Sequence, residues 1–195
     1  MSTRLQLLRS AERLFAVHGI AEVSLRQIGA DAGQRNTAAA HYHFGDKQTL
    51  LREVLRARLD TVDARRRELL AAVPAEPGDD VRPLVEALVL PLAAQAVEPG
   101  SHYVRFLDRL FAHLDHEVTA LARIGGFEQA FATARIVVER LPRLTGPLAA
   151  ARARWAGRLI ISALADLEAE QQTAPGDPEP YTTCLVDAVT GLLTR

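Results

Sequence analysis

Residues 24–47 read Ser-Leu-Arg-Gln-Ile-Gly-Ala-Asp-Ala-Gly-Gln-Arg-Asn-Thr-Ala-Ala-Ala-His-Tyr-His-Phe-Gly-Asp-Lys, and this stretch predicts two short helices joined by a turn. Ser24 and Gln27 have the spacing of a capping box, in which each side chain bonds the backbone N–H of the other. Gly33 stands where the first helix, expected over 24–32, must end in a left-handed conformation. A second helix, expected over 36–43, can then lie in the major groove of DNA.

The segments on either side of this motif complete a small three-helix unit. A helix expected over 3–18 carries an apolar stripe at helical spacing. The stripe consists of Leu5, Leu8, Ala11, Leu14 and Phe15. We expect Leu5 and Leu8 to close a core with Ile28 and Phe44. Asp46 is the expected N-cap of the helix that follows.

The order of these features resembles the TetR family of bacterial transcriptional repressors over roughly the first 55 residues. The matching positions are Ala11, Leu14, Phe15, Gly19, Ser24, Ile28, Ala32, Gly33, Phe44, Lys47, Leu50 and Leu51. The segment from Gly33 to Phe44 is one residue longer than the common family pattern, and His41 takes the usual tyrosine position. This is similar to the subset of the family with a Gln-Arg-Asn-Thr turn and a Tyr-His-Phe ending.

The resemblance implies two domains and a set of DNA-binding residues. Residues 1–60 would form the helix-turn-helix domain, with the motif at 24–43, and residues 61–195 a helical domain for effector binding and dimerisation. The residues expected at DNA are Ser24, Arg26, Gln27, Arg35, Asn36, Thr37, His41, Tyr42, His43 and Lys47.

Within that set, the residue types suggest different roles. Arg35, Asn36 and Thr37 enter the second helix, where Arg or Asn can make bidentate contacts with base edges. The alternative is that Asn36 or Thr37 only caps that helix. By analogy with the family, His41, Tyr42 and Lys47 contact phosphates. Arg26 and Gln27, at the start of the first helix, can add backbone contacts.

Composition is that of a globular protein, and charge is distributed unevenly along the chain. The chain has 195 residues, of which 48% are apolar and 24% charged, with a net charge of −1. Residues 1–70 carry a net +4 and the remainder a net −5. Such asymmetry is expected when one end contacts phosphates. No apolar signal core or membrane span occurs, and one cysteine, Cys184, suits a reducing compartment, so we expect a cytoplasmic protein.

The rest of the chain is also expected to be helical, which makes the fold class all-α. The remaining helices are expected over 46–73, 81–97, 101–122, 127–141, 147–172 and 179–194. The last two helices carry apolar residues on nearly every face, which is typical of a surface buried against a partner. We therefore expect a homodimer through residues 145–195. The alternative is that these residues only form intrachain core.

The resemblance also implies that the central helices enclose an effector pocket, which makes their large apolar residues candidates for binding a small apolar or aromatic molecule. They are Phe106, Leu110, Phe127, Phe131 and Trp155. For each of them, ordinary core packing is the alternative.

No pattern in the chain predicts an enzyme, a cofactor or a metal site. His113 and His116, with Glu117, have a spacing that can hold a divalent metal, but a solvated face or a pocket lining accounts for them more simply. Cys184 has no basic sequence neighbour that would make it a redox sensor. Neither a phosphate-binding glycine loop nor a nucleophile motif is present.

Two functional interpretations follow. The first is a ligand-responsive, homodimeric transcriptional repressor that binds a palindromic operator. The second is a helical interaction or small-molecule carrier protein whose helix-turn-helix no longer reads DNA. The basic N-terminal third and the presence of Arg35, Asn36 and Lys47 favour the first.

Overall fold

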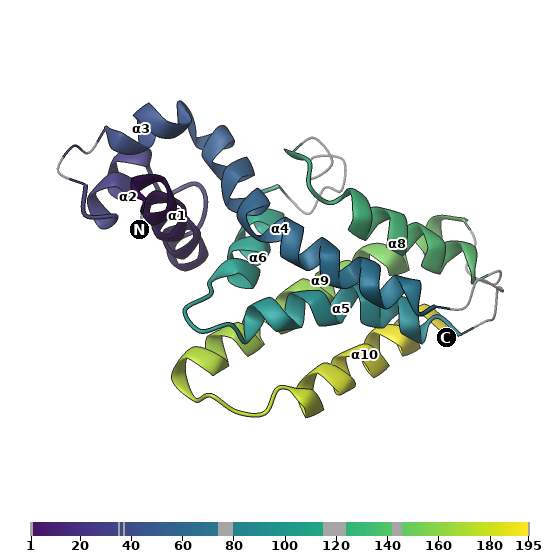
Figure 1. The fold of residues 1–195 in the computed structure, drawn as a ribbon. Helices are drawn as coiled ribbons and strands as arrows, with labels where there is room; N and C mark the ends of the chain where they lie inside the picture. Colours follow the sequence, from purple (N-terminus) through teal and green to yellow (C-terminus); the bar gives the residue numbers. More distant parts are fainter. Residues whose placement is uncertain are drawn as a thin grey trace.

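The computed structural model is all-α over the residues it describes, namely 2–34, 36, 38–73, 80–114, 124–141 and 146–194. The helices are α1 (Thr3–His18), α2 (Leu25–Asp31), α3 (Ala39–Phe44), α4 (Lys47–Ala71), α5 (Arg82–Ala96), α6 (Tyr103–His113), α8 (Glu128–Glu139), α9 (Gly146–Thr173) and α10 (Glu179–Thr194). Figure 1 shows α1, α2 and α3 together at one end of the molecule, with α4 running from there into a larger helical body. The predicted all-α fold class is confirmed.

Polar caps define where the helices of the N-terminal unit begin. The Ser2 hydroxyl accepts from the backbone N–H of Leu5 at 3.3 Å, and α1 starts at Thr3. The Asp46 carboxylate accepts from the N–H of Thr49 at 2.7 Å, which makes Asp46 the N-cap of α4 as expected. This hydrogen bond from the Thr49 backbone lowers the pKa of Asp46. Helix α4 is continuous through residue 60, so the two expected domains share one helix.

The N-terminal core differs from its prediction at one position. Leu8, Ile28 and Phe44 are buried as expected, but Leu5 is 39% exposed. Leu7 is fully buried instead. The expected stripe was drawn for one face of α1, whereas α1 is covered on two sides, by α2 and by α4 and α6.

The turn after α2 is longer than expected, and the helix after it is shorter. Gly33 has the predicted left-handed backbone, with φ of +69°. Helix α3, however, starts at Ala39 rather than at residue 36. Asn36 lies before the helix, where its side-chain oxygen accepts from the N–H of Ala38 at 3.0 Å. A short polar side chain that bonds the backbone two residues ahead makes a local turn that competes with helix formation.

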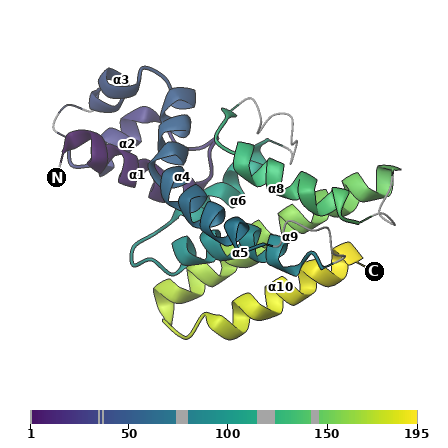
Figure 2. The same ribbon diagram turned by 45° about the vertical axis from the view of Figure 1, so that its right-hand side comes forward.

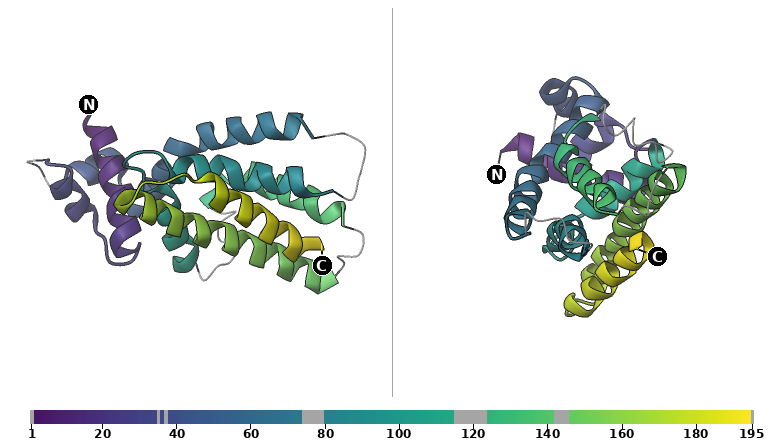
Figure 3. Two further views of the ribbon diagram at one scale, coloured as in Figure 1. Left: turned by 90° about the horizontal axis from the view of Figure 1, so that it is seen from below. Right: turned by 90° about the vertical axis from the view of Figure 1, so that its right-hand side faces the viewer.

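In the larger body, α5 packs against α4, α6, α8, α9 and α10, and α9 forms a second centre of packing. Helix α9 packs against α5, α6, α8 and α10. Figures 2 and 3 show α9 and α10 side by side along one side of the body. The Tyr181 hydroxyl on α10 donates to the carbonyl of Ala163 on α9 at 2.7 Å. Helix α6 packs against both α9 and α1, and it therefore connects the body with the N-terminal unit.

Candidate DNA-binding interface and effector cavity

The first turn of α2 is held by the predicted capping box. The Ser24 hydroxyl accepts from the N–H of Gln27 at 3.3 Å, and the Gln27 side-chain oxygen accepts from the N–H of Ser24 at 2.8 Å. Both side chains are thus occupied within the chain. Arg26 lies between them and is exposed, with no partner among the described residues. Of the three residues predicted at this helix start, Arg26 has the side chain most free to reach a phosphate.

The turn between α2 and α3 is braced against α1. The Gln34 side-chain amide donates to the side-chain oxygen of Gln6 and to the carbonyl of Ala32, each at 3.1 Å. Arg35 and Thr37, which were predicted to read bases, lie outside the described residues. Asn36 is exposed and uses its side-chain oxygen to cap Ala38, which leaves its amide NH₂ as a free donor.

Helix α3 presents a polar and aromatic face to solvent. Ala40 and Phe44 are buried and anchor the helix, whereas His41, Tyr42 and His43 are exposed. Tyr42 is 86% exposed, an unusually high value for an aromatic side chain. Its ring meets the His43 ring edge to face, with centroids 5.4 Å apart. All three predicted contact residues of α3 are thus accessible to a partner.

Lys47, the first residue of α4, has its side chain fixed by residues that precede α2. Its Nζ donates to the carbonyl of Ala21 at 3.1 Å and lies 5.9 Å from the centre of the Phe15 ring. Partial burial lowers the pKa of Lys47, and the nearby Glu22 acts in the opposite direction. The ammonium group is therefore held in place by α1 and the α1–α2 connection.

Arg4 belongs to the same region but has no signal in the sequence that would single it out. It forms an ion pair with Glu53, and its guanidinium lies 5.5 Å from the centre of the Phe44 ring. Its side chain is 50% exposed. Because it approaches α3 from the start of α1, only the packing of the two helices brings it to the candidate interface.

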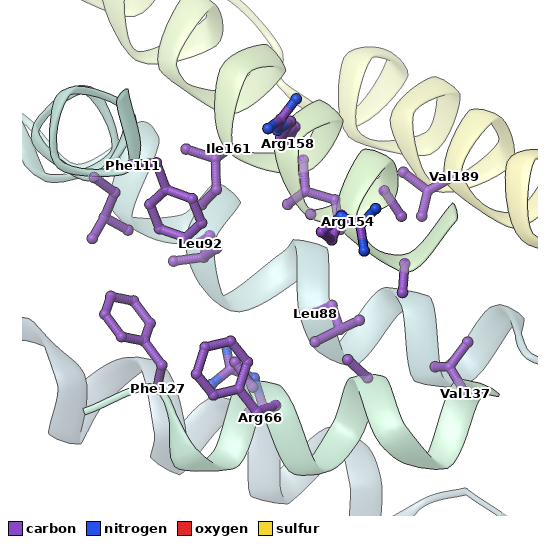
Figure 4. Close-up of a pocket in the computed structure, with 18 of the residues that line it drawn as sticks. Arg66, Leu88, Leu92, Phe111, Phe127, Val137, Arg154, Arg158, Ile161 and Val189 are labelled. Carbon is purple, nitrogen blue, oxygen red and sulfur yellow. The ribbon is translucent and has the colours of Figure 1, made fainter. Parts of the chain in front are cut away.

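The helical body contains an apolar cavity of about 460 Å³ (Figure 4). Its walls come from α4, α5, α6, α8, α9 and α10, and apolar side chains form most of its surface. A cavity of this size is in the range that binds small molecules. Phe127 is a central wall residue, with ring centroids 6.0 Å from Phe111 and 6.1 Å from Phe131.

The five aromatic and apolar residues proposed for an effector site divide into three groups. Phe127 and Phe131 border the cavity. Phe106 and Leu110 are fully buried and do not border it; the Phe106 ring packs against Phe15 of α1, with centroids 6.0 Å apart. Trp155 is 49% exposed and is also absent from the lining. Phe106 and Leu110 lie on the α6 face that meets α1.

Several polar residues at the cavity were not predicted from the sequence, because they come from different helices. Arg66 on α4 is buried at the wall, where its Nε donates to the carbonyl of Ala87 at 3.2 Å and its guanidinium pairs with Asp63. Burial lowers the pKa of Arg66. Tyr103 on α6 is fully buried beside it, and burial raises the pKa of its phenol. Arg154 on α9 borders the cavity while remaining exposed.

A buried carboxylate on α1 links the N-terminal unit to the body. Glu12 accepts from the backbone N–H of His102, just before α6, at 3.0 Å. It also pairs with Arg58 of α4 at 3.3 Å, and Arg58 in turn pairs with Glu98 at 3.0 Å. A cation shared by two carboxylates, one of them buried, ties three segments together.

A second buried carboxylate, Glu168 of α9, holds the same end of α6. It accepts from the N–H of Val104 at 3.1 Å, from the N–H of Arg105 at 2.9 Å and from the Ser101 hydroxyl at 3.0 Å. These donors are the otherwise unpaired N–H groups of a helix start. Burial raises the pKa of Glu168, although its hydrogen bonds favour the charged form. The start of α6 is therefore fixed from both sides.

The other candidate sites are described only in part. Among the residues that the structure describes, no three His, Cys, Asp or Glu side chains gather as a metal site. His113 is exposed at the end of α6, while His116 and Glu117 lie outside the described residues. Cys184 is exposed on α10. None of the described helices is long and apolar enough to cross a membrane.

Comparison with known proteins gives matches at two scales. Residues 7–54 match the family model of bacterial regulatory proteins of the tetR family. A segment of 86 residues is 36% identical to the HTH-type transcriptional repressor KstR2 of Rhodococcus jostii (strain RHA1), and it covers 44% of this chain and 39% of that repressor. The sequence match therefore spans well under half of the relative's length.

Solved structures resemble the chain over nearly its whole length. A TetR family transcription regulator from Marinobacter aquaeolei VT8 has a TM-score of 0.64 at 15% identity, covering 97% of this chain and 94% of that one. SCO4454, a TetR-family transcriptional regulator from Streptomyces coelicolor, has a TM-score of 0.58 at 21% identity, covering 98% and 94%. Residues 7–54 thus match the tetR-family model, and the whole chain has the fold of these regulators.

Proposed function

We propose that this chain is a ligand-responsive transcriptional repressor of the TetR family that binds a palindromic operator as a homodimer. One observation carries the proposal. The chain joins a helix-turn-helix with an exposed polar face on α3 to a helical body that encloses an apolar cavity. The first part is suited to DNA, and the second to a small molecule.

For DNA recognition, α3 would enter the major groove with the turn before it. Arg35, Asn36 and Thr37 would contact base edges, since they directly precede this helix in the sequence and Arg and Asn can bond bases bidentately. His41, Tyr42 and Lys47 would hold the phosphate backbone, and Arg26 would add a contact from α2. The exposure of His41 and Tyr42 and the anchored position of Lys47 support this assignment.

For dimerisation, α9 and α10 would meet their copies in a four-helix arrangement. Helix α9 exposes three large apolar side chains on one face, at Leu148, Trp155 and Leu159. Beside it, α10 exposes the small residues Cys184 and Ala188. An exposed apolar stripe next to a face of small residues allows two helix pairs to approach closely.

For ligand response, α6 would transmit the state of the cavity. Tyr103, Leu107 and Phe111 on α6 border the cavity, while Phe106 on the same helix packs against α1. A ligand that favours one position of α6 would shift the population between conformations with different spacing of the two α3 helices. Operator half-sites have a fixed spacing, so binding would weaken.

The test uses fluorescence anisotropy with the full chain and duplexes tiled from the DNA upstream of its gene. We expect one palindromic segment to bind more tightly than its scrambled version, with affinity falling steeply as salt rises. Sedimentation of the same sample should show a dimer. A protein that binds every duplex equally, or none at any salt concentration, would instead be the interaction or carrier protein of the alternative interpretation.

A further inference from the structure

The charged residues that border the cavity are all arginines. Arg66, Arg154 and Arg158 belong to the lining, whereas no Asp or Glu does among the described residues. Arg66 is already neutralised by Asp63 and satisfied by the carbonyl of Ala87. The other two lie on α9, across the cavity from Arg66 and Phe127 (Figure 4). The cavity therefore has an apolar interior, and the two arginines of α9 place positive charge at its edge with no acidic residue in the described lining to balance it.

Arg154 and Arg158 stand one helical turn apart, and nothing in the described part of the chain pairs with either. Both are exposed, and neither takes part in an ion pair or hydrogen bond there. Like charges four residues apart on a helix repel each other and destabilise the helix slightly. An anion held between the two guanidinium groups would remove that repulsion.

Helix α9 alternates these arginines with small residues that open the space beside them. Ala153 and Gly157 precede Arg154 and Arg158 and border the same cavity. A Cβ atom built on Gly157 would meet nothing within 4 Å. Across the cavity, α8 also presents a small residue, Ala134. The small residues that leave room in the cavity and the arginines at its edge thus lie on the same two turns of α9.

We infer that the effector is an anionic amphiphile, with an apolar body in the cavity and a carboxylate or phosphate head paired with Arg154 and Arg158. This inference rests on the proposed function, because it names the ligand class of the same cavity. Guanidinium groups bind carboxylate and phosphate oxygens through paired hydrogen bonds. The apolar walls account for the rest of the ligand.

The two arginines could alternatively pair with acidic residues of a second copy of the chain. They lie on α9 next to Trp155 and Leu159, which belong to the exposed apolar face. The two explanations differ in their readout, because loss of an intersubunit ion pair changes the oligomeric state, and loss of a ligand contact changes ligand affinity. Each variant is therefore also examined by sedimentation.

The experiment is calorimetric titration of the full chain with octanoate, octyl phosphate and 1-octanol, three probes with the same apolar body. We expect one or both anions to bind about tenfold more tightly than the alcohol, since a hydrogen bond between two charged groups is stronger than one that involves a neutral hydroxyl. In the double variant Arg154→Gln, Arg158→Gln, this preference should disappear while 1-octanol binding stays within about twofold of wild type. Arg152→Gln is the matched control, because Arg152 is on α9 but does not border the cavity.

The comparison of octanoate with octyl phosphate identifies the head group. Equal affinity of all three probes, absence of anion binding at millimolar concentration, or an unchanged preference in the double variant would overturn the inference. If the double variant unfolds, Arg158→Gln alone is measured, with a partial loss of preference expected. A change of oligomeric state with unchanged anion preference would assign the arginines to the subunit interface instead.

Operator binding is measured in parallel to separate this inference from the proposed function. A chain that binds its operator but shows no anion preference contradicts only the ligand class. A chain that prefers anions but binds no DNA contradicts only the proposed function.

Discussion

Ser24 shows how much of the candidate interface is determined by a few neighbouring residues. Its hydroxyl and the Gln27 side chain satisfy each other's backbone N–H groups, and so they define the start of α2. The same residues were predicted near phosphates. Their side chains are engaged in capping, so in the proposed DNA-binding function their contribution would be to hold α2 and the exposed Arg26 in place.

Ser24→Ala should therefore lower the free energy of unfolding by about 1 kcal/mol, the usual value of a lost N-cap. Urea unfolding followed by circular dichroism measures it. Ser24→Asp is the control, since aspartate is also a good N-cap and should retain most of the stability. Equal stability of Ser24→Ala and wild type would show that the capping box contributes nothing here.

Lys47 and Asn36 separate backbone binding from base reading. Lys47→Ala should weaken operator and scrambled duplexes about equally, and it should reduce the slope of log affinity against log salt by about one per half-site. Asn36→Ala should cost about 1–3 kcal/mol on the operator only. Anisotropy titrations of both variants at several salt concentrations measure this. The assignment is wrong if Lys47→Ala changes sequence preference and Asn36→Ala does not.

At the scale of elements, α9 has two faces with different roles. One face carries Ile160 and Leu164, both buried in the body. The other exposes Leu148, Trp155 and Leu159. The sequence predicted apolar residues on nearly every face of this helix, and both of these faces carry them. Packing within the chain buries only one of the two faces.

Leu159→Glu should give a monomer in sedimentation and lose operator binding, since a charge would be buried at the proposed dimer interface. Leu159 is a sharper target than Leu192 on α10, which is partly buried and packs against the core. Ala132→Glu places the same charge on the exposed side of α8 and should leave the dimer intact. A dimeric Leu159→Glu would exclude this face of α9 from the interface.

The buried carboxyl of Glu168, which bonds the start of α6, should make the stability of the fold depend on pH. Burial raises the pKa of Glu168 above that of an unfolded glutamate, so folding favours its protonated form. Its contribution is therefore most favourable below the unfolded pKa, and it declines as pH rises through the folded pKa. Melting temperatures are measured for wild type and Glu168→Gln at pH 4, 5.5 and 7. The melting temperature of wild type relative to that of the variant should fall as pH rises. A constant difference would contradict this sign.

At the scale of the whole molecule, α6 connects the two ends. Glu12 of α1 and Glu168 of α9 both bond backbone N–H groups at its start, and its sides meet α1 and the cavity. A ligand bound in the cavity would act on α6 directly, and an operator bound to the N-terminal unit would act on it through α1. We propose α6 as the route for coupling between the two sites.

Glu12→Gln should weaken that coupling. It removes the charge that Arg58 pairs with and should lower stability by about 1–3 kcal/mol. The ratio of operator affinities without and with octanoate should move toward one, since that ratio measures the coupling free energy. Glu170→Gln, on the exposed side of α9, is the control. An unchanged ratio in Glu12→Gln would assign the coupling to other contacts.

The helix-turn-helix could be predicted from the sequence because its determinants are local. The Ser24–Gln27 capping box, the left-handed Gly33 and the Asp46 cap act over two to four residues, and each is present as predicted. The start of α3 was placed three residues too early, since a helical stretch and a side-chain turn at Asn36 compete over the same short range.

The cavity could not be predicted in this way. Phe106 and Phe127 are the same residue type on central helices, yet one packs against α1 and the other borders the cavity. Arg66 and Arg154 are far apart in the chain and meet the same space. Local preferences decide which residues form a helix, whereas the face that meets a cavity depends on how several helices pack together, which only the tertiary structure decides.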